Sequence, residues 1–215
     1  MQITFGTIQN NRQDILNYIT QEKQKSDFKV IDIGGAVNGW TSNIIDMLVD
    51  KNTVDSNSSM QLDICVFEEW KKLLSYVEIN GMYDYAICTH TLEDVYNPLL
   101  ALEFLPKIAK AGVITIPSMR TELSKVESNN WLGYIHHRWI FDIIDGSILL
   151  IPKLELLSSL VGNSIKFIPE QEEIKYEWSG NIPYKVFMNN YLGPSPETVI
   201  NSYKKLINNL KYKQL

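Results

Sequence analysis

The 215-residue sequence has few of the side chains that bind metals or form cross-links, with two cysteines and three histidines. Cys65 and Cys88 lie in apolar runs without the CxxC or Cys/His spacing of a zinc site, so we expect both to be reduced core residues. Positive charge is also scarce, because 25 acidic residues outnumber 20 basic ones. This balance supplies no broad field for a phosphate backbone, so nucleic acid is not an expected partner.

Long apolar segments are missing too. No stretch approaches the ~20 apolar residues that span a bilayer. The first residues, MQITFGTIQNNRQDIL, lack the basic start and apolar block of a signal peptide. We therefore expect a cytoplasmic protein without a membrane partner. Hydrophobic residues still make up 45 % of the sequence, enough for a full core, and a homodimer is compatible with these totals.

Apolar runs and amphipathic stretches alternate along the first half of the chain. Strands separated by helices of about 10–15 residues indicate βαβ units and a parallel sheet. The predicted fold class is therefore α/β, a Rossmann-like open and mostly parallel sheet with helices on both faces. The expected strands are 28–35, 52–55, 61–66, 83–90 and 112–117, and the expected helices are 8–24, 41–50, 68–77 and 97–110.

The pattern changes beyond residue 118. Residues 118–131 form a polar insertion, and the extended segments 133–143 and 146–153 predict a hairpin that turns at Asp145-Gly146. Residues 174–190 predict further hairpins, and a last helix is expected over 195–212. Without a clear linker or repeat, we predict a single domain, 1–215, in which a β-rich C-terminal part, 119–215, decorates a core at 28–118.

Ligands of open α/β sheets bind beyond the carboxyl ends of the strands. Acidic groups after neighbouring strands suit ribose hydroxyls and an amino group, whereas they would repel a pyrophosphate. The first turn also lacks GxGxxG, and no Tyr-x-x-x-Lys pair follows the fourth predicted strand, which argues against a nicotinamide-dependent oxidoreductase. The residues at this edge are Asp32, Gly34, Gly35, Asp55, Asp63, Ile64, Thr89 and His90.

The segments KVIDIGGAVNGWT, NTVDSN, LDIC and YDYAICTHTLEDVYNPLLALEFLPKIAKAGVITIPS resemble the class I S-adenosylmethionine-dependent methyltransferases over roughly residues 28–118. The resemblance implies S-adenosylmethionine as cofactor. Asp55 follows Asp32 by about the 20 positions expected of a ribose-binding acid. The first turn departs from the family's DxGxGxG, since Ala36 stands at the second required glycine. By resemblance, Asp32, Gly34 and Gly35 hold the methionine part, Asp55 the ribose, Asp63 and Ile64 the adenine, and Thr89 lies at the same site.

More narrowly, the HTLED segment at 90–94 and the HHRW segment at 136–139 resemble an uncharacterised methyltransferase-like group. His137 or His136 is the expected general base for a methyl acceptor, with His90 nearer the methyl donor. Glu93 is expected to orient a histidine or meet an amino group. Arg138 suits an anionic acceptor, and Trp139 could stack on a sugar.

Each of these residues has a structural alternative. The histidine pair could be one buried and one exposed residue without a shared task. Asp94 could cap the next helix, Arg138 could pair with Glu122 or Glu127, and Trp139 could pack in the core. Asp94, His90 and one of the pair could form a two-His-one-carboxylate metal site, but no local spacing supports it, so no metal is predicted.

The sequence therefore predicts a methyltransferase that transfers a methyl group to oxygen or nitrogen of a small-molecule or carbohydrate-type acceptor, such as a nucleotide-linked sugar. The altered glycine turn keeps a second interpretation open. In that interpretation the chain is a catalytically inactive, methyltransferase-like module that uses its C-terminal part for association.

Overall fold

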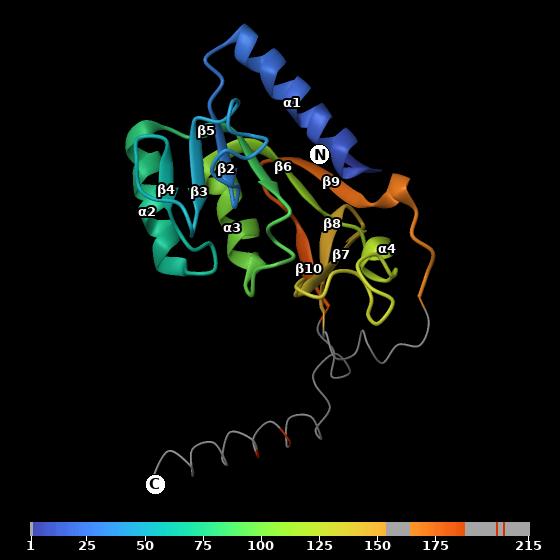
Figure 1. Ribbon diagram of the computed structural model, residues 1–215. Coiled ribbons are helices and arrows are strands. Elements are labelled where there is room, and N and C mark those ends of the chain that lie inside the picture. The colour runs from blue at the N-terminus through green and yellow to red at the C-terminus, as the bar shows by residue number, and fades with distance from the viewer. Residues whose placement is uncertain (1, 154–163, 188–200, 202–203, 205–215) are drawn as a thin grey trace.

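The computed structural model describes residues 2–153, 164–187, 201 and 204. Its centre is a seven-stranded sheet in the order β4-β3-β2-β5-β6-β9-β1 (Figure 1). The helix predicted over 195–212 lies outside the described residues, apart from Asn201 and Lys204. The strands are β1 (Gln2–Gly6), β2 (Val30–Ile33), β3 (Met47–Asp50), β4 (Ser59–Gln61), β5 (Tyr83–Thr89), β6 (Ala109–Pro117) and β9 (Glu173–Ser179).

The sheet is mainly parallel. All neighbours from β4 to β6 pair in parallel, whereas β9 is antiparallel to both β6 and β1. From β2 the chain first builds outward through β3 and β4 and then returns to add β5 and β6 on the other side. The prediction of an α/β fold with a mostly parallel sheet is confirmed, and the strand order reverses between β2 and β5.

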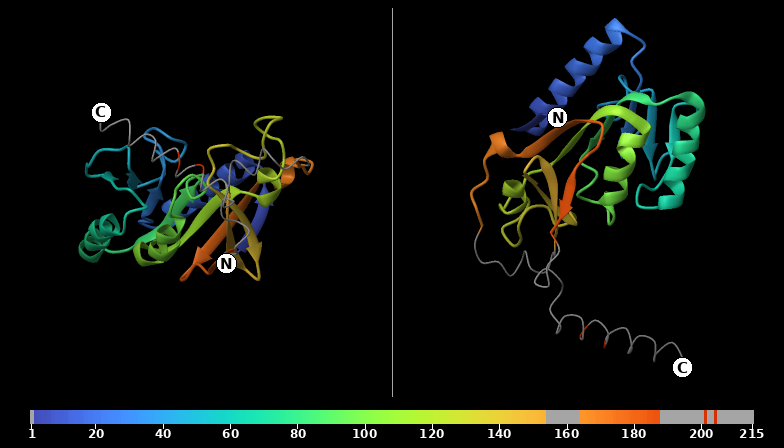
Figure 2. Two further views of the ribbon diagram at one scale, coloured as in Figure 1. Left: turned by 90° about the horizontal axis from the view of Figure 1, so that it is seen from below. Right: turned by 180° about the vertical axis from the view of Figure 1, so that it is seen from behind.

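Helices cover both faces of the sheet because its strands alternate between two apolar clusters. In β2, Ile31 and Ile33 face the cluster that includes α2 (Phe67–Asn80) and α3 (Pro98–Ile108), whereas Val30 faces Ile15 and Ile19 of α1 (Ile8–Lys25). Figure 2 shows α2 and α3 side by side when the molecule is seen from behind. None of the described helices is long and apolar enough to span a membrane.

The region between β2 and β4 differs from the sequence prediction. The helix expected over 41–50 is wrong, because residues 37–44 form turns and Met47–Asp50 forms β3. The strand expected at 52–55 is also wrong, because the strand ends at Asp50 and residues 52–55 lie in the loop after it. The run Met-Leu-Val is buried between two strands of the sheet, and a short apolar run does not distinguish helix from strand by periodicity. Strand β1 was not predicted.

A second, three-stranded sheet has the order β10-β8-β7. Strands β7 (Trp139–Ile144) and β8 (Ser147–Pro152) form an antiparallel hairpin around Asp145-Gly146, and both turn residues have positive φ, as such hairpin turns require. Strand β10 (Tyr184–Val186) runs parallel to β8. Phe141 and Leu150 pack this sheet on the same apolar cluster as α2 and α3.

The polar segment after β6 is anchored to the fold. It begins with the short helix α4 (Met119–Glu122), in which Thr121 and Glu122 are buried. Thr121 Oγ1 donates to the Glu172 carbonyl at 2.6 Å, and Ser118 Oγ donates to the Gln171 carbonyl. The segment is polar because its hydroxyl groups donate hydrogen bonds to backbone carbonyls of the 3-10 turn Pro169–Gln171 and its neighbours. These carbonyls take the place of water as hydrogen-bond partners.

Candidate functional site

A cavity of about 280 Å³ lies beyond the carboxyl ends of β2, β3 and β5, at the reversal of strand order. This is where open α/β sheets bind ligands. The cavity is lined by both polar and apolar side chains, and the charged ones are three aspartates, one lysine and one arginine besides His90. Its lining comprises Gly34, Asp50, Lys51, Leu62, Asp63, Ile64, Cys65, His90, Thr91, Asp94, Val95, Tyr96 and Arg138.

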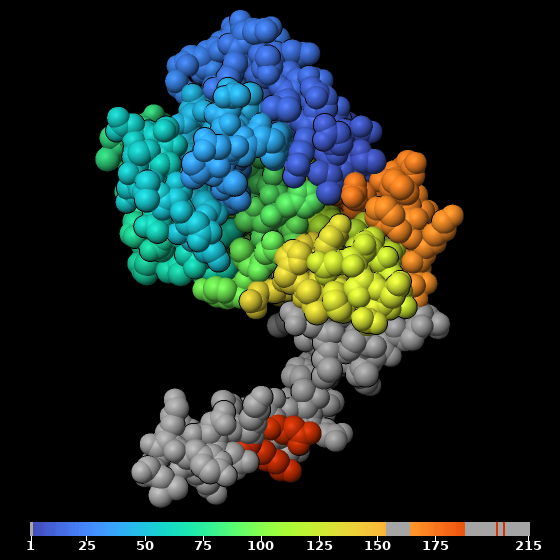
Figure 3. Space-filling model, in the orientation of Figure 1, coloured from blue at the N-terminus to red at the C-terminus, as the bar shows by residue number. Residues whose placement is uncertain are grey.

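A second cavity of about 250 Å³ adjoins the first, because His90 and Asp94 line both. It lies between β5, the α4 region and the segment before β7. In Figure 3, the segment before β7 (yellow) lies beside the loop after β5 (green), on the side away from the loops after β2 and β3. The second lining comprises Ile8, His90, Glu93, Asp94, Pro117, Thr121, Tyr134, His136, His137 and Glu172.

The turn after β2 is built by close packing. Gly34 has φ of 81°, and a Cβ there would meet Thr91 at 2.3 Å. A Cβ on Gly35 would meet the Asp32 carboxylate at 2.2 Å. Both glycines are therefore required by the fold, and only Gly34 is among the residues that line the first cavity.

Asp32 lies beneath this turn and is 2 % exposed. Its Oδ2 accepts a hydrogen bond from Thr41 Oγ1, and its Oδ1 has no hydrogen-bond partner among the described residues. Burial raises the pKa of Asp32 to about 6, although the Thr41 hydrogen bond opposes the shift. Asp32 thus supports the turn and lies outside the set that lines the cavity.

The acid that ends the second parallel strand is not the one predicted. Asp50 is the last residue of β3 and lines the first cavity. Asp55 was predicted to end this strand, but it lies in the following loop, is exposed, and accepts a hydrogen bond from the Gln61 amide at 2.8 Å. That expectation depended on the wrong strand boundary. Asp63 and Ile64 do line the cavity, and Asp63 Oδ1 accepts from the Cys65 amide.

His90, at the end of β5, has φ of 48° and joins the two cavities. Its Nε2 donates to Glu173 Oε2 at 2.6 Å, and its Nδ1 lies 3.2 Å from Glu93 Oε1. Burial disfavours the charged ring, but the two glutamates outweigh it and raise the pKa of His90 to about 9. The ring is a cation at neutral pH, so it suits holding charge better than accepting a proton.

The two glutamates beside His90 differ in their other partners. Glu173 Oε1 accepts from Asn11 Nδ2 of α1 at 2.7 Å, which ties the amino-terminal helix to the site. Glu93 is 1 % exposed, and neither of its oxygens has a hydrogen-bond partner in the described part of the chain. A buried carboxylate is costly unless a nearby charge compensates it, and the His90 ring, 3.2 Å from Glu93 Oε1, provides that charge.

The adjacent histidines divide into a buried and an exposed residue that face one carboxylate. His137 is buried, and its Nδ1 donates to Glu122 Oε1 at 2.7 Å. The Lys153 ammonium binds the other oxygen of Glu122. His137 Nε2 lies 3.7 Å and His136 Nε2 lies 3.8 Å from Asp94 Oδ1. Both rings line the second cavity.

The geometry decides two of the structural alternatives, those for Asp94 and Arg138. Asp94 does not cap the next helix, because α3 begins at Pro98 with Asn97 as its N-cap. Arg138 is exposed and lines the first cavity. Its expected ion pair with Glu122 or Glu127 is absent among the described residues.

Five predicted site residues lie outside both linings: Asp32, Gly35 and Asp55, described above, together with Thr89 and Trp139. Thr89 ends β5 in register with Thr115, and its carbonyl accepts from Thr91 Oγ1 at 3.0 Å. Trp139 donates from Nε1 to the Val95 carbonyl at 2.9 Å and packs against the apolar core. Its packing role was the structural alternative considered for it.

Sequence reasoning missed several residues that build the site. Asp50 carried a signal, since it ends an apolar run as the other edge residues do. Glu173, Glu122 and Lys153 carried none, because each is an ordinary charged residue until the fold buries it beside a histidine.

No family model matches the sequence, and no curated protein matches it. Among solved structures, the chain is similar to the MycE methyltransferase from the mycinamycin biosynthetic pathway, in complex with Mg and SAH. The identity is 11 % and the TM-score 0.34, over 90 % of this chain and 53 % of that chain. The chain thus spans about half the length of that protein, and so distant a likeness assigns it neither cofactor nor activity.

Proposed function

We propose that the protein is an S-adenosylmethionine-dependent methyltransferase that methylates an oxygen or nitrogen of a small-molecule or carbohydrate-type acceptor. The observation that carries the proposal is the pair of adjoining cavities at the reversal of strand order, one lined by acids and the other by histidines. Each is just below the range of about 300–1,000 Å³ typical of ligand pockets, and the two adjoin. Two cavities that share His90 and Asp94 suit a donor and an acceptor that must meet.

The first cavity offers carboxylates to the cationic groups of the cofactor. S-adenosylmethionine carries a sulfonium and an ammonium group, and Asp50, Asp63 and Asp94 line the cavity together with three basic side chains, Lys51, His90 and Arg138. Asp50 takes the ribose role expected of Asp55, because it is the acid at the end of the second parallel strand. Asp63 and Ile64 remain assigned to the adenine, and Gly34 lines the same cavity.

The second cavity is proposed for the acceptor. When bound, the cofactor supplies an electrophilic methyl group, and its sulfonium becomes a neutral thioether as the new bond to the acceptor forms. The acceptor atom must lose a proton, and His137 is placed to take it at Nε2, because Nδ1 already donates to Glu122. Arg138 at the rim suits an anionic part of the acceptor. The segment before β7, which contributes Tyr134, His136 and His137, then forms the substrate-side wall.

The test uses calorimetric titration with S-adenosylmethionine and S-adenosylhomocysteine, with NADH as the control ligand. Saturable binding of the sulfur compounds alone is the expected result. A matched pair of variants locates the ribose: Asp50→Asn should weaken binding roughly tenfold or more, the loss of about one charged hydrogen bond, whereas Asp55→Asn should bind as the wild type does. Failure of both sulfur compounds to bind would overturn the proposal.

One observation favours a second function. Residues 37–44 between β2 and β3 form turns where a helix was expected, so the first turn has lost the helix amino terminus that often borders such a pocket. The chain could then be a catalytically inactive, methyltransferase-like binding module. The double variant His136→Ala with His137→Ala separates the two functions, because only an enzyme has turnover of S-adenosylmethionine with an acceptor for that variant to abolish.

A further inference from the structure

We propose that Asp94, His136 and His137 form a binding site for a divalent transition-metal cation at the boundary of the two cavities. One ligand atom from each of these residues lies within 4.8 Å of the others. The residues come from two separate segments, the loop after β5 and the segment before β7, so the fold and not local sequence spacing brings them together. This explains why the sequence predicted no metal site.

The distances suit a metal after small movements. A tetrahedral cation with bonds of about 2.0–2.2 Å to nitrogen and oxygen places its ligand atoms about 3.4 Å apart. Asp94 Oδ1 is 3.7 Å from His137 Nε2 and 3.8 Å from His136 Nε2. For these two pairs the excess is a few tenths of an ångström, and the two histidine atoms lie within 4.8 Å of each other. Both Asp94 and His136 are exposed enough to rotate.

The hydrogen bonds of His137 point to a cation independently of these distances. Its Nδ1 bonds to the buried Glu122, which leaves Nε2, the nitrogen that faces the Asp94 carboxylate, to bind a cation. A cation between Nε2 and this carboxylate would bind to both. A carboxylate that holds the far nitrogen of a metal-binding histidine is also the usual second partner of such sites. Lys153 balances the charge of Glu122.

The third histidine is excluded from the site. Both ring nitrogens of His90 face glutamates, at 2.6 Å from Glu173 and 3.2 Å from Glu93, so neither is free for a metal. The sequence alternative of Asp94, His90 and one of the pair is therefore replaced by a set that uses both members of the pair.

The ligand types indicate the class of metal. Two imidazoles and one carboxylate suit zinc, iron, cobalt or nickel, whereas magnesium prefers oxygen ligands. Three protein ligands leave a coordination position for a ligand in the second cavity. That role rests on the proposed function: the cation would bind an oxygen of the acceptor and lower the pKa of its hydroxyl, whose proton would pass to water. His137 would then be a ligand of the cation in place of the base role given to it above.

The test is a Co²⁺ titration of untagged protein that has been stripped with a chelator. We expect saturable binding of one Co²⁺ per chain, with the visible absorption of cobalt bound to protein nitrogen, and displacement by Zn²⁺. The variants His136→Ala and Asp94→Asn should each lower the Co²⁺ affinity roughly tenfold or more. Asp27→Asn is the matched control, since Asp27 is exposed and pairs only with Lys29 among the described residues.

Circular dichroism of each variant checks that it is folded. Equal Co²⁺ affinity in the wild type and a folded His136→Ala variant would overturn the metal site, as would the absence of saturable binding. Titration of the same stripped protein with S-adenosylmethionine separates the two proposals. Binding of the sulfonium compound without Co²⁺ binding removes the metal alone, and Co²⁺ binding without the sulfonium compound removes the methyltransferase alone.

Discussion

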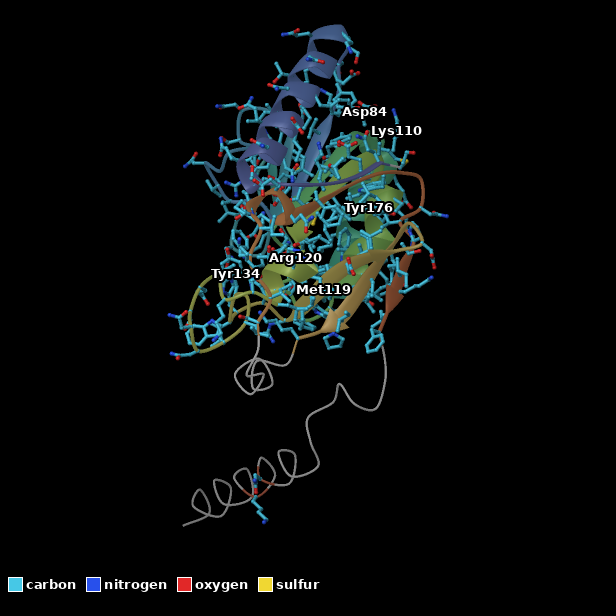
Figure 4. The ribbon with its side chains drawn as sticks, turned by 90° about the vertical axis from the view of Figure 1, so that its right-hand side faces the viewer. Asp84, Lys110, Met119, Arg120, Tyr134 and Tyr176 are labelled. Atoms are coloured by element: carbon cyan, nitrogen blue, oxygen red, sulfur yellow. The ribbon has the colours of Figure 1, made fainter. Side chains whose placement is uncertain are left out.

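Charged side chains are partly exposed at the amino ends of the strands of the central sheet and buried at the carboxyl ends. At the amino ends of the strands, Asp84 pairs with Lys110 and Asp46 with Lys23, each at 2.7 Å and partly open to water. At the carboxyl ends, Glu93, Glu122 and Glu173 are each 1 % exposed. In Figure 4, Asp84 and Lys110 lie together at one end of the molecule, and Arg120 and Tyr134 lie toward the other.

The difference in burial shows which charged groups the folded chain keeps away from water, and their pKa values differ accordingly. Burial opposes the ionisation of Asp84, but hydrogen bonds from Lys110 and the Lys29 amide lower its pKa below the usual range. At the other end, burial raises the pKa of Asp32 to about 6 and the glutamates raise that of His90 to about 9. Strongly shifted groups gathered at a cleft are typical of sites that bind or react.

The largest difference in the free energy of unfolding should come from replacing one lysine at each end of the sheet, Lys153 at the carboxyl ends of the strands and Lys110 at the amino ends. Lys153→Met leaves the buried Glu122 without its ammonium partner, so the free energy of unfolding should fall by about 3–5 kcal/mol. Lys110→Met removes a partly exposed ion pair and should cost at most about 1 kcal/mol. Urea denaturation of both variants measures the difference.

Similar losses in the two lysine variants would contradict the contrast, because they would mean that water reaches Glu122 in solution. The double variant Lys153→Met with Glu122→Gln provides the control. It removes the unpaired charge as well as its partner, so it should recover part of the lost stability.

A smaller effect should appear in the dependence of stability on pH. The pKa of His90 is raised in the folded chain, so its contribution is fully present below about pH 6.5 and is lost as the pH rises through about 9. The shift corresponds to about 3 kcal/mol. Urea midpoints across this interval should therefore fall in the wild type.

The matched variant for this slope is His90→Asn, because asparagine tolerates the positive φ at this position. It should be less stable than the wild type at neutral pH and nearly flat over the same interval. An unchanged slope in the variant would assign the pH dependence to groups other than His90.

How much of the fold was predictable depended on how each segment is buried. The strands over 83–90 and 112–117 and the helices over 8–24, 68–77 and 97–110 were found because their apolar patterns are long and bounded. Strand β3 was missed because four residues buried on two faces have no distinctive period. Strand β1 was missed because its pairing with β9 joins residues far apart in the chain.

The location of the candidate site was predictable from the sequence, but only some of its residues were. The rule that ligands bind at the carboxyl ends of strands selected His90, Asp63 and Ile64, and each lines a cavity. The same rule selected Asp55 in place of Asp50 through a boundary error of five residues. The glutamates that orient His90 and His137 follow from tertiary contacts, so no local pattern could have named them.

The smallest effect should come from Asp32→Asn, which removes a charge that the fold buries. Because burial raises the pKa of Asp32, its contribution to stability is present below about pH 4 and is lost as the pH rises through about 6. The variant keeps the shape and can still accept from Thr41. It should therefore be more stable than the wild type at pH 7, by about 1–2 kcal/mol after allowance for the unpaired amide hydrogens.

The Asp32→Asn variant also tests whether the buried carboxylate contributes to binding of the cofactor. If Asp32 is kept for the methionine end of S-adenosylmethionine, Asp32→Asn should gain stability in urea and lose affinity for the cofactor in calorimetry. Gly81→Ala controls for stability changes unrelated to the site, because Gly81 has φ of 89° with open space around it at the far end of α2 and should change only stability. A gain in stability with unchanged affinity would make Asp32 a support of the turn and nothing more.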